Sequence, residues 1–544
     1  MERENLQPPF STILIPLRNG FFRTTWIASQ IASLGWLVQT VTVSWLMATI
    51  SDSDVMVAIV QGTSTLPAFV LSIPAGAIVD SFSRHRVMLA GRCLVALTSF
   101  ALVIAVACGF INPWLILGLT FVGGCGFALI GPAWNASIGD ILQRRDVPAA
   151  VMLMSIGYNI VRSAGPALGG VVLALSGPLA AFGLAALSYL VPLMTLMRSK
   201  WHIPSSPLPR ERIVTAIYDG VRFTTMSSVI RVAIVRATIF GFASIPILAL
   251  LPIIVRDQIA SGPIAYGILL ASFGMGAFAA GMANGFLRRI MPLDRLIASA
   301  SALCAACCLL VAFTSSMAVA VAALAIGGAG GLITWTAIDV CVQLASPRWV
   351  VGRTLSIYYA VSNGGVAAGS WVWGTVAQHY SVTWALAGAA VSLLLVAAAG
   401  IVLPISHRSE SDQPTGDFTP PEVALEVKPR SGPIVVRTDY TINDEDIDAF
   451  LGCMRERRYN LSRAGARGWA LQRNLQSPSL WTETFRTPTW TDFLRLNHRL
   501  PVADRAAGER LLQFHDKEHP PYTTFSVERT TEATRRPFVS RPPK

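Results

Sequence analysis

The sequence predicts an all-α membrane protein, with 12 transmembrane helices in two pseudo-symmetric six-helix halves, followed by a small α+β domain. Its 544 residues are 53% hydrophobic and only 14% charged, whereas soluble domains carry about 25% charged residues. Residues 1–405 are poor in charge and contain repeated apolar segments of about 20 residues, the length that crosses a bilayer. Part of the first half also recurs in the second.

Twelve apolar segments are long enough to span the membrane. They cover residues 24–49, 55–79, 87–110, 114–140, 148–175, 179–197, 229–255, 263–286, 294–314, 317–345, 354–378 and 382–404. Arginines occur in all the even-numbered loops, whereas among the odd-numbered loops only the seventh has a cation, Arg256. Because Lys and Arg mark cytoplasmic loops, both termini are expected in the cytoplasm. The net charge of +12 lies mainly in these loops, so we expect no nucleic-acid partner.

The composition divides the chain into six parts. These are an N-terminal half (1–197), a cytoplasmic central loop (198–228), a C-terminal half (229–405), a disordered linker (406–432), a soluble domain (433–530) and a basic tail (531–544). The start Met-Glu-Arg-Glu lacks the pattern of a cleaved signal peptide. In the central loop, Ile213, Ile217 and Val221 repeat every four residues, which predicts an amphipathic helix.

An internal repeat supports the two halves. A shift of 204 residues aligns spans four and five with spans ten and eleven. It places Gly123 on Gly327, Gly124 on Gly328, Gly126 on Gly330, Asn135 on Asp339, Arg144 on Arg348, Asn159 on Asn363, Gly165 on Gly369 and Gly170 on Gly374. Parallel repeats of this kind are related by an axis along the membrane normal.

The soluble domain has the expected element order β-α-β-β-α-β. Strands are predicted at 434–442, 468–475, 480–487 and 522–528, and helices at about 443–460, from Thr489 onward and within 501–516. This order is ferredoxin-like. Seven of the eight cysteines lie in apolar segments, and Cys304, Cys307 and Cys308 are predicted to pack rather than bind metal or form disulfides. No cofactor is expected.

The loop between spans two and three contains the pattern Gly76-x-x-x-Asp80-x-x-x-Arg84-x-Arg86. This pattern resembles the cytoplasmic loop of the major facilitator superfamily, although Ser81 and Ser83 depart from it. The resemblance implies the major facilitator fold and places Asp80 against the start of span eleven, where Arg353 lies. We expect Asp80 to latch the two halves; the alternative is a basic loop that only sets orientation. The eighth loop has Arg288 and Arg289 but no equivalent acid.

Span five ends in Gly165-Pro166-x-x-Gly169-Gly170. This resembles the end of the span-five motif of exporting antiporters, and simple helix packing explains the glycines equally well. The span-four arginine of that group should fall near Leu119 or Thr120 and is absent. Proton coupling is therefore an expectation from the resemblance alone.

Five polar residues inside the spans are candidates for substrate binding or coupling: Asn135, Asn159, Arg162, Asp339 and Asn363. Arg162 lies roughly 20 Å from the cytoplasmic end of its span, where a charge costs at least about 2.5 kcal/mol and usually has a function. A structural salt bridge is the alternative. Asp339 is either a buried proton carrier or a helix-end acid in water, and the asparagines are either ligands or interhelical hydrogen-bonding groups.

Residues 10–405 resemble the enterobactin-exporter-like, or transmembrane secretion effector, branch of the superfamily, as seen in Leu66-Pro67, Gly131–Trp134 and Gly157–Asn159. The resemblance implies a bacterial inner-membrane exporter of siderophores, antibiotics or other small amphiphilic molecules. It implies a transporter in the lipid bilayer rather than an enzyme, with proton coupling as an expectation. Trp490–Arg495 resembles dimeric antibiotic-biosynthesis monooxygenases. The domain is therefore either an active enzyme or a regulatory or dimerising module through which the chain self-associates. The whole chain is either an exporter with a soluble appendage or a membrane-tethered enzyme or sensor whose spans no longer transport.

Overall fold

The computed structural model describes residues 14–81, 83–142, 146–198, 213–347, 349–405, 421, 423–500, 510–511, 513–514 and 521–529. The chain divides into two compact units. The first comprises Met1–Ile217, Ser227–Ser346 and Val351–Ser406, and the second comprises Tyr218–Met226, Pro347–Val350 and His407–Lys544. The sequence had placed residues 198–228 in a separate central loop, whereas residues 218–226 belong to the second unit.

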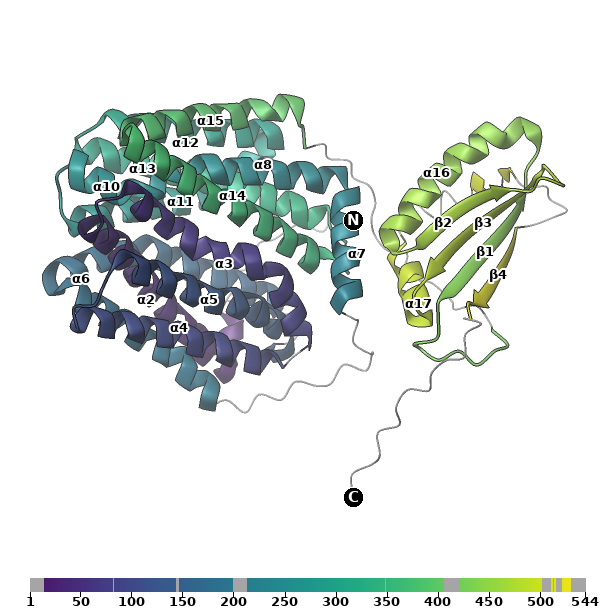
Figure 1. Ribbon diagram of the computed structural model, residues 1–544, viewed down its shortest axis with the longest axis horizontal. Helices are drawn as coiled ribbons and strands as arrows, with labels where there is room; N and C mark the ends of the chain where they lie inside the picture. The colour runs from purple at the N-terminus through teal and green to yellow at the C-terminus, as the bar shows by residue number, and fades with distance from the viewer. Residues whose placement is uncertain are drawn as a thin grey trace, which may run out of the picture. The chain divides into compact units, whose positions relative to one another are not determined.

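The first unit is helical throughout its described part (Figure 1). Its first half contains a short 3-10 helix (Ile15–Arg18), α2 (Gly20–Ile50), α3 (Asp54–Ser81), α4 (Arg84–Ala107), α5 (Pro113–Ile141) and α6 (Val147–Arg198). Its second half contains α8 (Ser228–Ser244), α9 (Pro246–Ala249), α10 (Leu251–Ile253), a π-helical turn (Ile254–Gln258), α11 (Pro263–Ile290), α12 (Leu293–Phe313), α13 (Met317–Leu344), α14 (Val351–His379) and α15 (Val382–Val402). The predicted amphipathic helix of the central loop is α7 (Ile213–Met226).

Ten helices of the described chain are long and apolar enough to cross a membrane. One of them, Met152–Arg198, is 47 residues long and covers two expected spans. It breaks at Gly177, whose backbone angles (φ 75°, ψ 178°) are accessible essentially only to glycine. Helix α14 has 29 residues but is less apolar, because serine, glycine and asparagine interrupt it. With both parts of α6 and with α14, the twelve predicted spans are all helical.

Glycines at equivalent positions of the two repeats pack against equivalent helices. A Cβ at Gly165 would lie 2.7 Å from a carbon of Leu37 in α2, and one at Gly369 would lie 2.5 Å from a carbonyl oxygen of α8. Gly170 meets α11 in the same close way, and Gly374 meets α3. Span five therefore packs on spans one and eight, and span eleven packs on spans seven and two. The two predicted pseudo-symmetric halves are confirmed.

The hydrophobic cores differ at the two ends of the first unit. One large cluster of described residues combines both halves and includes Met47 and Val57 with Leu251. Met47 and Val57 flank the first loop, so this shared core includes the end of the unit where that loop lies. At the opposite end, Phe22 belongs to a cluster from the first half alone and Leu296 to a cluster from the second half alone.

The second unit contains a four-stranded antiparallel sheet. Its strands are β1 (Ile434–Thr441), β2 (Arg467–Arg473), β3 (Leu480–Thr487) and β4 (Tyr522–Val527), in the order β2-β3-β1-β4. Helices α16 (Ile447–Ala464) and α17 (Trp490–Arg499) lie on one face of the sheet (Figure 1). Alternate residues of β1, from Ile434 to Tyr440, are buried. The chain order β-α-β-β-α-β is the predicted ferredoxin-like one.

Glu483 of β3 is fully buried beneath the helices and is held by three donors. The Tyr440 hydroxyl donates to one carboxylate oxygen (3.0 Å), the Trp469 indole N–H donates to the other (2.8 Å), and the Arg457 guanidinium donates to both (3.0 and 3.2 Å). Burial, together with the neighbouring Glu483 charge, raises the pKa of Tyr440, so this phenol stays a donor. These three partners of Glu483 all lie within the domain, which indicates a structural role.

Local signals fix the start of α17. The side chain of Thr489 accepts from the Asp492 N–H (3.1 Å), which confirms the predicted capping pattern. The N–H groups of Trp490 and Thr491 donate to the carbonyls of Ser431 and Pro429 (2.7 and 3.1 Å). The end of the expected disordered linker is therefore held by hydrogen bonds, while its residues 406–420 and 422 and the basic tail 531–544 lie outside the described residues.

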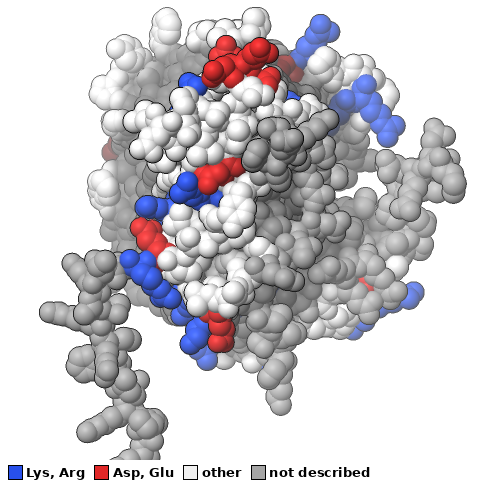
Figure 2. Space-filling view, turned by 90° about the vertical axis from the view of Figure 1, so that its right-hand side faces the viewer, with Lys and Arg blue, Asp and Glu red and all other residues white. Residues whose placement is uncertain are grey.

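Figure 2 shows one face of the molecule, on which acidic and basic side chains lie close together.

Candidate transport site

Arg162 lies where the two halves meet. It belongs to α6, and a Cβ placed at Gly274 of α11 would lie 2.9 Å from the Arg162 carbonyl oxygen and 3.0 Å from the Cα of Ser163. Its side chain is partly exposed. Within the described part of the chain, its guanidinium forms no hydrogen bond and no ion pair. The structural salt bridge and the functional role of Arg162 therefore both stay predictions.

Asp339 of α13 lies beside two tyrosines of α14. Its carboxylate interacts with the hydroxyls of Tyr358 and Tyr359, whose rings lie 5.0 Å apart. The Oδ1 atom of Asp339 and the hydroxyl of Tyr358 are buried, and neither has a well-formed hydrogen bond to the described residues. A buried carboxylate oxygen weighs against a helix-end acid in water. Asp339 forms no ion pair with Arg162 among the described contacts.

Asn363 lies one turn beyond Tyr359 on α14. Its amide N–H donates to the Tyr359 carbonyl (2.7 Å), so this bond stays within one helix rather than joining two. Asp339 and Asn363 thus both lie next to Tyr359, Asp339 at its hydroxyl and Asn363 at its carbonyl. The side chains of Asn135 and Asn159 lie outside the described residues.

The glycine motif of span five serves two helix contacts. Gly165 and Gly169 lie against α2, and a Cβ at Gly169 would be 3.1 Å from the Cα of Val38. Gly170 faces Gly267 of α11, where a Cβ would be 3.0 Å from the Cα of Gly267 and 2.6 Å from a carbonyl oxygen. Pro166 is buried, and its carbonyl oxygen would lie 2.7 Å from a Cβ at Gly267. The motif thus brings α6 close to both α2 and α11.

The loop between spans two and three is short, because α3 ends at Ser81 and α4 begins at Arg84. Arg84 is partly buried and Arg86 is exposed, and the neighbouring His85 ring contacts the Leu196 carbonyl (3.0 Å) at the end of α6. The side chain of Asp80 lies outside the described residues, and Gly76 has none. The latch between Asp80 and the start of α14 therefore stays a prediction.

Polar contacts join the halves at the end of the first loop. The Ser53 hydroxyl donates to the side-chain oxygen of Gln378 (2.7 Å), which also accepts from the Val55 N–H (3.3 Å). Arg256, paired with Asp257, donates to the carbonyl of Ala48. These contacts link span two to span eleven and span one to span seven, at the end where the core is shared.

Sequence reasoning missed two buried arginines. Arg236 of α8 is 1% exposed and pairs with Asp294 at the start of α12, whose carboxylate also accepts from the Ile405 N–H (3.2 Å). Arg92 of α4 is 8% exposed and donates to the Ser29 hydroxyl (3.4 Å). Both lie inside segments recognised as spans, so the rule that singled out Arg162 also applied to them.

A family model described as transmembrane secretion effector matches residues 11–533. The chain belongs to this family. Because the match extends to residue 533, it includes the C-terminal α+β domain as well as the helices. The chain is thus a membrane protein of the major facilitator type.

Two curated relatives match part of this family member. An uncharacterized MFS-type transporter, YfiS, of Bacillus subtilis is 25% identical over 225 residues, which are 40% of this chain and 52% of the relative. The staphyloferrin A transporter of Staphylococcus aureus is 23% identical over 236 residues, 42% of this chain and 57% of the relative. The chain therefore spans about half the length of the curated relatives it matches.

Solved transporters share the fold of this family member. The nucleoside transporter NupG is 14% identical with a TM-score of 0.56, covering 70% of this chain and 98% of that one. A bacterial homologue of the human lysosomal transporter Spinster, inward-facing and occupied, is 14% identical with a TM-score of 0.55, covering 71% and 97%. A POT family transporter with 5-aminolevulinic acid is 13% identical with a TM-score of 0.58, covering 70% and 95%. At these identities the likeness concerns the fold alone.

Proposed function

We propose that this transporter is a secondary active exporter of small amphiphilic molecules, of the siderophore, antibiotic or drug-like kind. The observation that carries the proposal is Arg162, an intramembrane cation at the contact of α6 with α11 that has no partner among the described residues. Such a cation is costly in a membrane unless it meets an anion or faces a polar cavity. A substrate with a carboxylate or another anionic group would supply that partner.

Substrate class and direction rest on likeness. The staphyloferrin A transporter is a relative over 42% of this chain, which supports a siderophore-like substrate. The glycine motif at Gly165–Gly170 resembles that of exporting antiporters and joins α6 of the first half to α11 of the second. Export is therefore the direction that we propose.

Alternating access with proton coupling is the proposed mechanism. The contacts of Ser53 with Gln378 and of Arg256 with the Ala48 carbonyl would hold the halves together at the first-loop end while substrate enters from the other end. Release would require these contacts to break. Asp339, beside Tyr358 and Tyr359, is the proposed proton carrier, because its Oδ1 atom is buried and an acid inside a span usually has a function.

A deletion strain tests the proposal. Compounds that accumulate in cells without the gene should leave again when the wild-type chain is supplied, and Arg162→Ala at equal protein level should restore little of this export. Arg455→Ala provides the matched control, because Arg455 is exposed and bonds to the carbonyl of Leu451 in its own helix. Equal export by wild type and Arg162→Ala would contradict the proposed site.

The same experiment separates the exporter from a membrane-tethered monooxygenase-like enzyme. An exporter releases the accumulated compound unchanged, whereas a monooxygenase adds an oxygen atom, which mass spectrometry of the medium detects. We also propose a bacterial inner-membrane location with both termini in the cytoplasm, and self-association through the C-terminal domain. Cross-linking of the full chain in membranes tests the self-association.

A further inference from the structure

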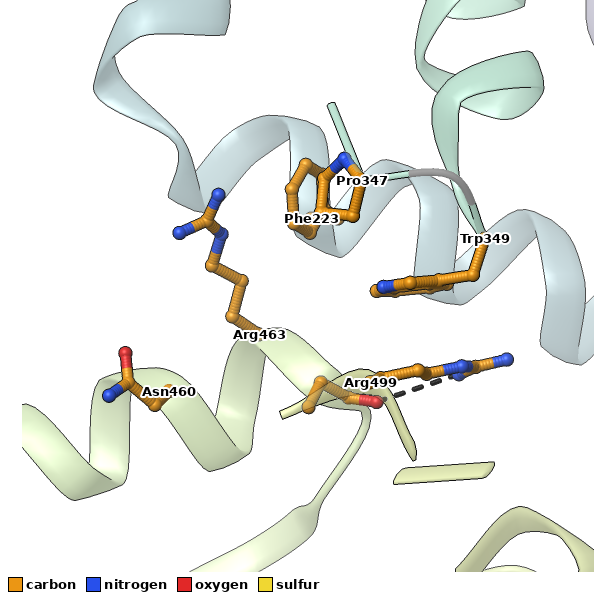
Figure 3. A pocket seen from close by; sticks show the side chains of 7 residues that line it. Phe223, Pro347, Trp349, Asn460, Arg463 and Arg499 are labelled. Atoms are coloured by element: carbon orange, nitrogen blue, oxygen red, sulfur yellow. Dashed lines mark hydrogen bonds between the residues drawn. The ribbon is translucent and has the colours of Figure 1, made fainter. Parts of the chain in front are cut away.

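The second unit contains two loop segments together with the C-terminal domain. Residues Tyr218–Met226, the end of α7, and Pro347–Val350 belong to it although they lie far from the domain in the sequence. Two arginines of the domain stack on aromatic rings of these segments (Figure 3). The guanidinium carbon of Arg463 lies 4.5 Å from the Phe223 ring centroid, and that of Arg499 lies 4.1 Å from the Trp349 centroid.

Polar contacts add to this stacking. Arg499 forms an ion pair with Asp219 (3.3 Å), and the two side chains are only 11% and 8% exposed. Arg222 donates to the Ala466 carbonyl (2.7 Å), and the Tyr459 hydroxyl donates to the Met226 carbonyl (3.2 Å). The loop segments are thus bound through both side-chain and main-chain groups.

Arg499 performs two tasks that lysine could not combine. Its planar guanidinium covers the indole of Trp349 and at the same time donates to Asp219 from its edge. Arginine suits this arrangement because it is planar, weakly hydrated and rich in donors. Cation–π contacts are also strongest when they are removed from water, and both partners of the ion pair are largely buried.

We propose that this surface, formed by the C-terminal ends of α16 and α17 and the turn at Ala466, is a binding surface for the chain's own segments 218–226 and 347–350. We call it the brace surface. Met226 precedes α8 by two positions, and Val350 immediately precedes α14. The segments bound at the brace surface therefore continue along the chain into the first turns of spans seven and eleven.

The brace surface is permanent rather than a switch. Spans seven and eleven belong to the same half, and α8 packs on α14 within that half. Rocking of one half against the other consequently leaves their first turns in the same relation. The brace surface can stay occupied through the whole transport cycle, and export depends on it. This last statement rests on the proposed function.

Hydrogen exchange of the full-length chain in lipid nanodiscs tests the binding surface without any substrate. Combining Arg463→Ala with Arg499→Ala should speed amide exchange in residues 218–226 and 347–350 by about tenfold or more. Arg499→Lys, which keeps the charge near Asp219 but not the planar stacking, should speed exchange less and guards against misfolding of the double variant. Arg455→Ala, on the same helix as Arg463, should leave both segments unchanged.

Unchanged exchange in both segments of a folded double variant would overturn the brace surface, as would an equal effect of Arg455→Ala. Export is then measured for the same variants at equal protein level. Slower export by the double variant supports the role of the brace in transport, and export equal to wild type overturns that role. If the wild-type chain itself exports no accumulated compound, the proposed function fails while the exchange result on the surface still stands.

Discussion

The hydroxyl of Ser53 donates to the side-chain oxygen of Gln378 at 2.7 Å, joining residues 325 positions apart. Ser53 precedes α3 in the first half, and Gln378 lies in the last turn of α14 in the second. The contact lies at the end of the first unit where one hydrophobic core serves both halves. It is therefore suited to hold the two halves together at that end.

Gln378→Ala should loosen this end. The variant loses the hydrogen bonds from the Ser53 hydroxyl and the Val55 N–H, each worth about 0.5–1.5 kcal/mol, which should raise the population open at the first-loop end at least about 2-fold. A reporter cysteine at buried Ala48, in a chain whose exposed Cys108 is replaced by Ser, should then react faster with a membrane-impermeant maleimide. Thr375→Ala is the control, since Thr375 bonds to the Trp371 carbonyl of its own helix. Equal labelling rates in both variants would show that Gln378 does not hold the halves together.

Arg162→Ala should impair export without destabilising the protein, because its guanidinium has no partner in the described structure to leave unpaired. Arg162→Lys should also impair export, since lysine lacks the planar fork. Arg236→Ala is the contrasting variant: it leaves Asp294 without its buried partner and should cost about 3 kcal/mol. Thermal unfolding of the purified variants measures this difference. A drop in stability for Arg162→Ala as large as that for Arg236→Ala would restore the salt-bridge interpretation.

Asp80→Asn tests the predicted latch at the opposite end. A partly buried contact between a carboxylate and a helix N-terminus is worth about 1–2 kcal/mol, which changes a two-state equilibrium roughly 5- to 30-fold. We expect greater cytoplasmic accessibility of cysteines placed along the transport path, and slower export. Asp52→Asn, at an exposed position in the first loop, should change neither. If accessibility and export both stay at the wild-type level, the loop Gly76–Arg86 only sets orientation.

Arg457→Met should destabilise the C-terminal domain strongly. It removes the guanidinium from fully buried Glu483, and an uncompensated buried charge costs about 3–5 kcal/mol. Arg437→Met breaks a surface pair with Asp439 and should cost less than about 1 kcal/mol. Hydrogen exchange in β1 and β3 of the full chain distinguishes the two. Similar protection in both variants would mean that the Glu483 network contributes little to stability.

A tag placed after Lys544 tests the orientation. The arginine-rich even-numbered loops predict a cytoplasmic location, so an impermeant reagent should label this tag only after the cells are permeabilised. A tag in the first loop, next to Asp52, should be labelled in intact cells and serves as the control. Labelling of the Lys544 tag from outside would reverse the assignment.

The spans, their number and the repeat could be read from the sequence, because a bilayer imposes a minimum apolar length that local composition reveals. Gly165 and Gly369 align without a gap and pack on equivalent spans. The cap at Thr489 was equally readable, since it depends on residues three positions apart. The break at Gly177 falls between two predicted spans, because the apolar composition that defines a span also shows where one span ends and the next begins.

Only the tertiary structure decided which distant residues meet. It placed Arg162 against α11, Asp339 beside Tyr358, and Arg236 with Asp294. It also brought Trp349 to Arg499, 150 residues further along the chain. A charge in an apolar run shows in the sequence, but its partner does not. The physical reason is that helix length and period are set by neighbours along the chain, whereas pairing depends on how whole helices pack together.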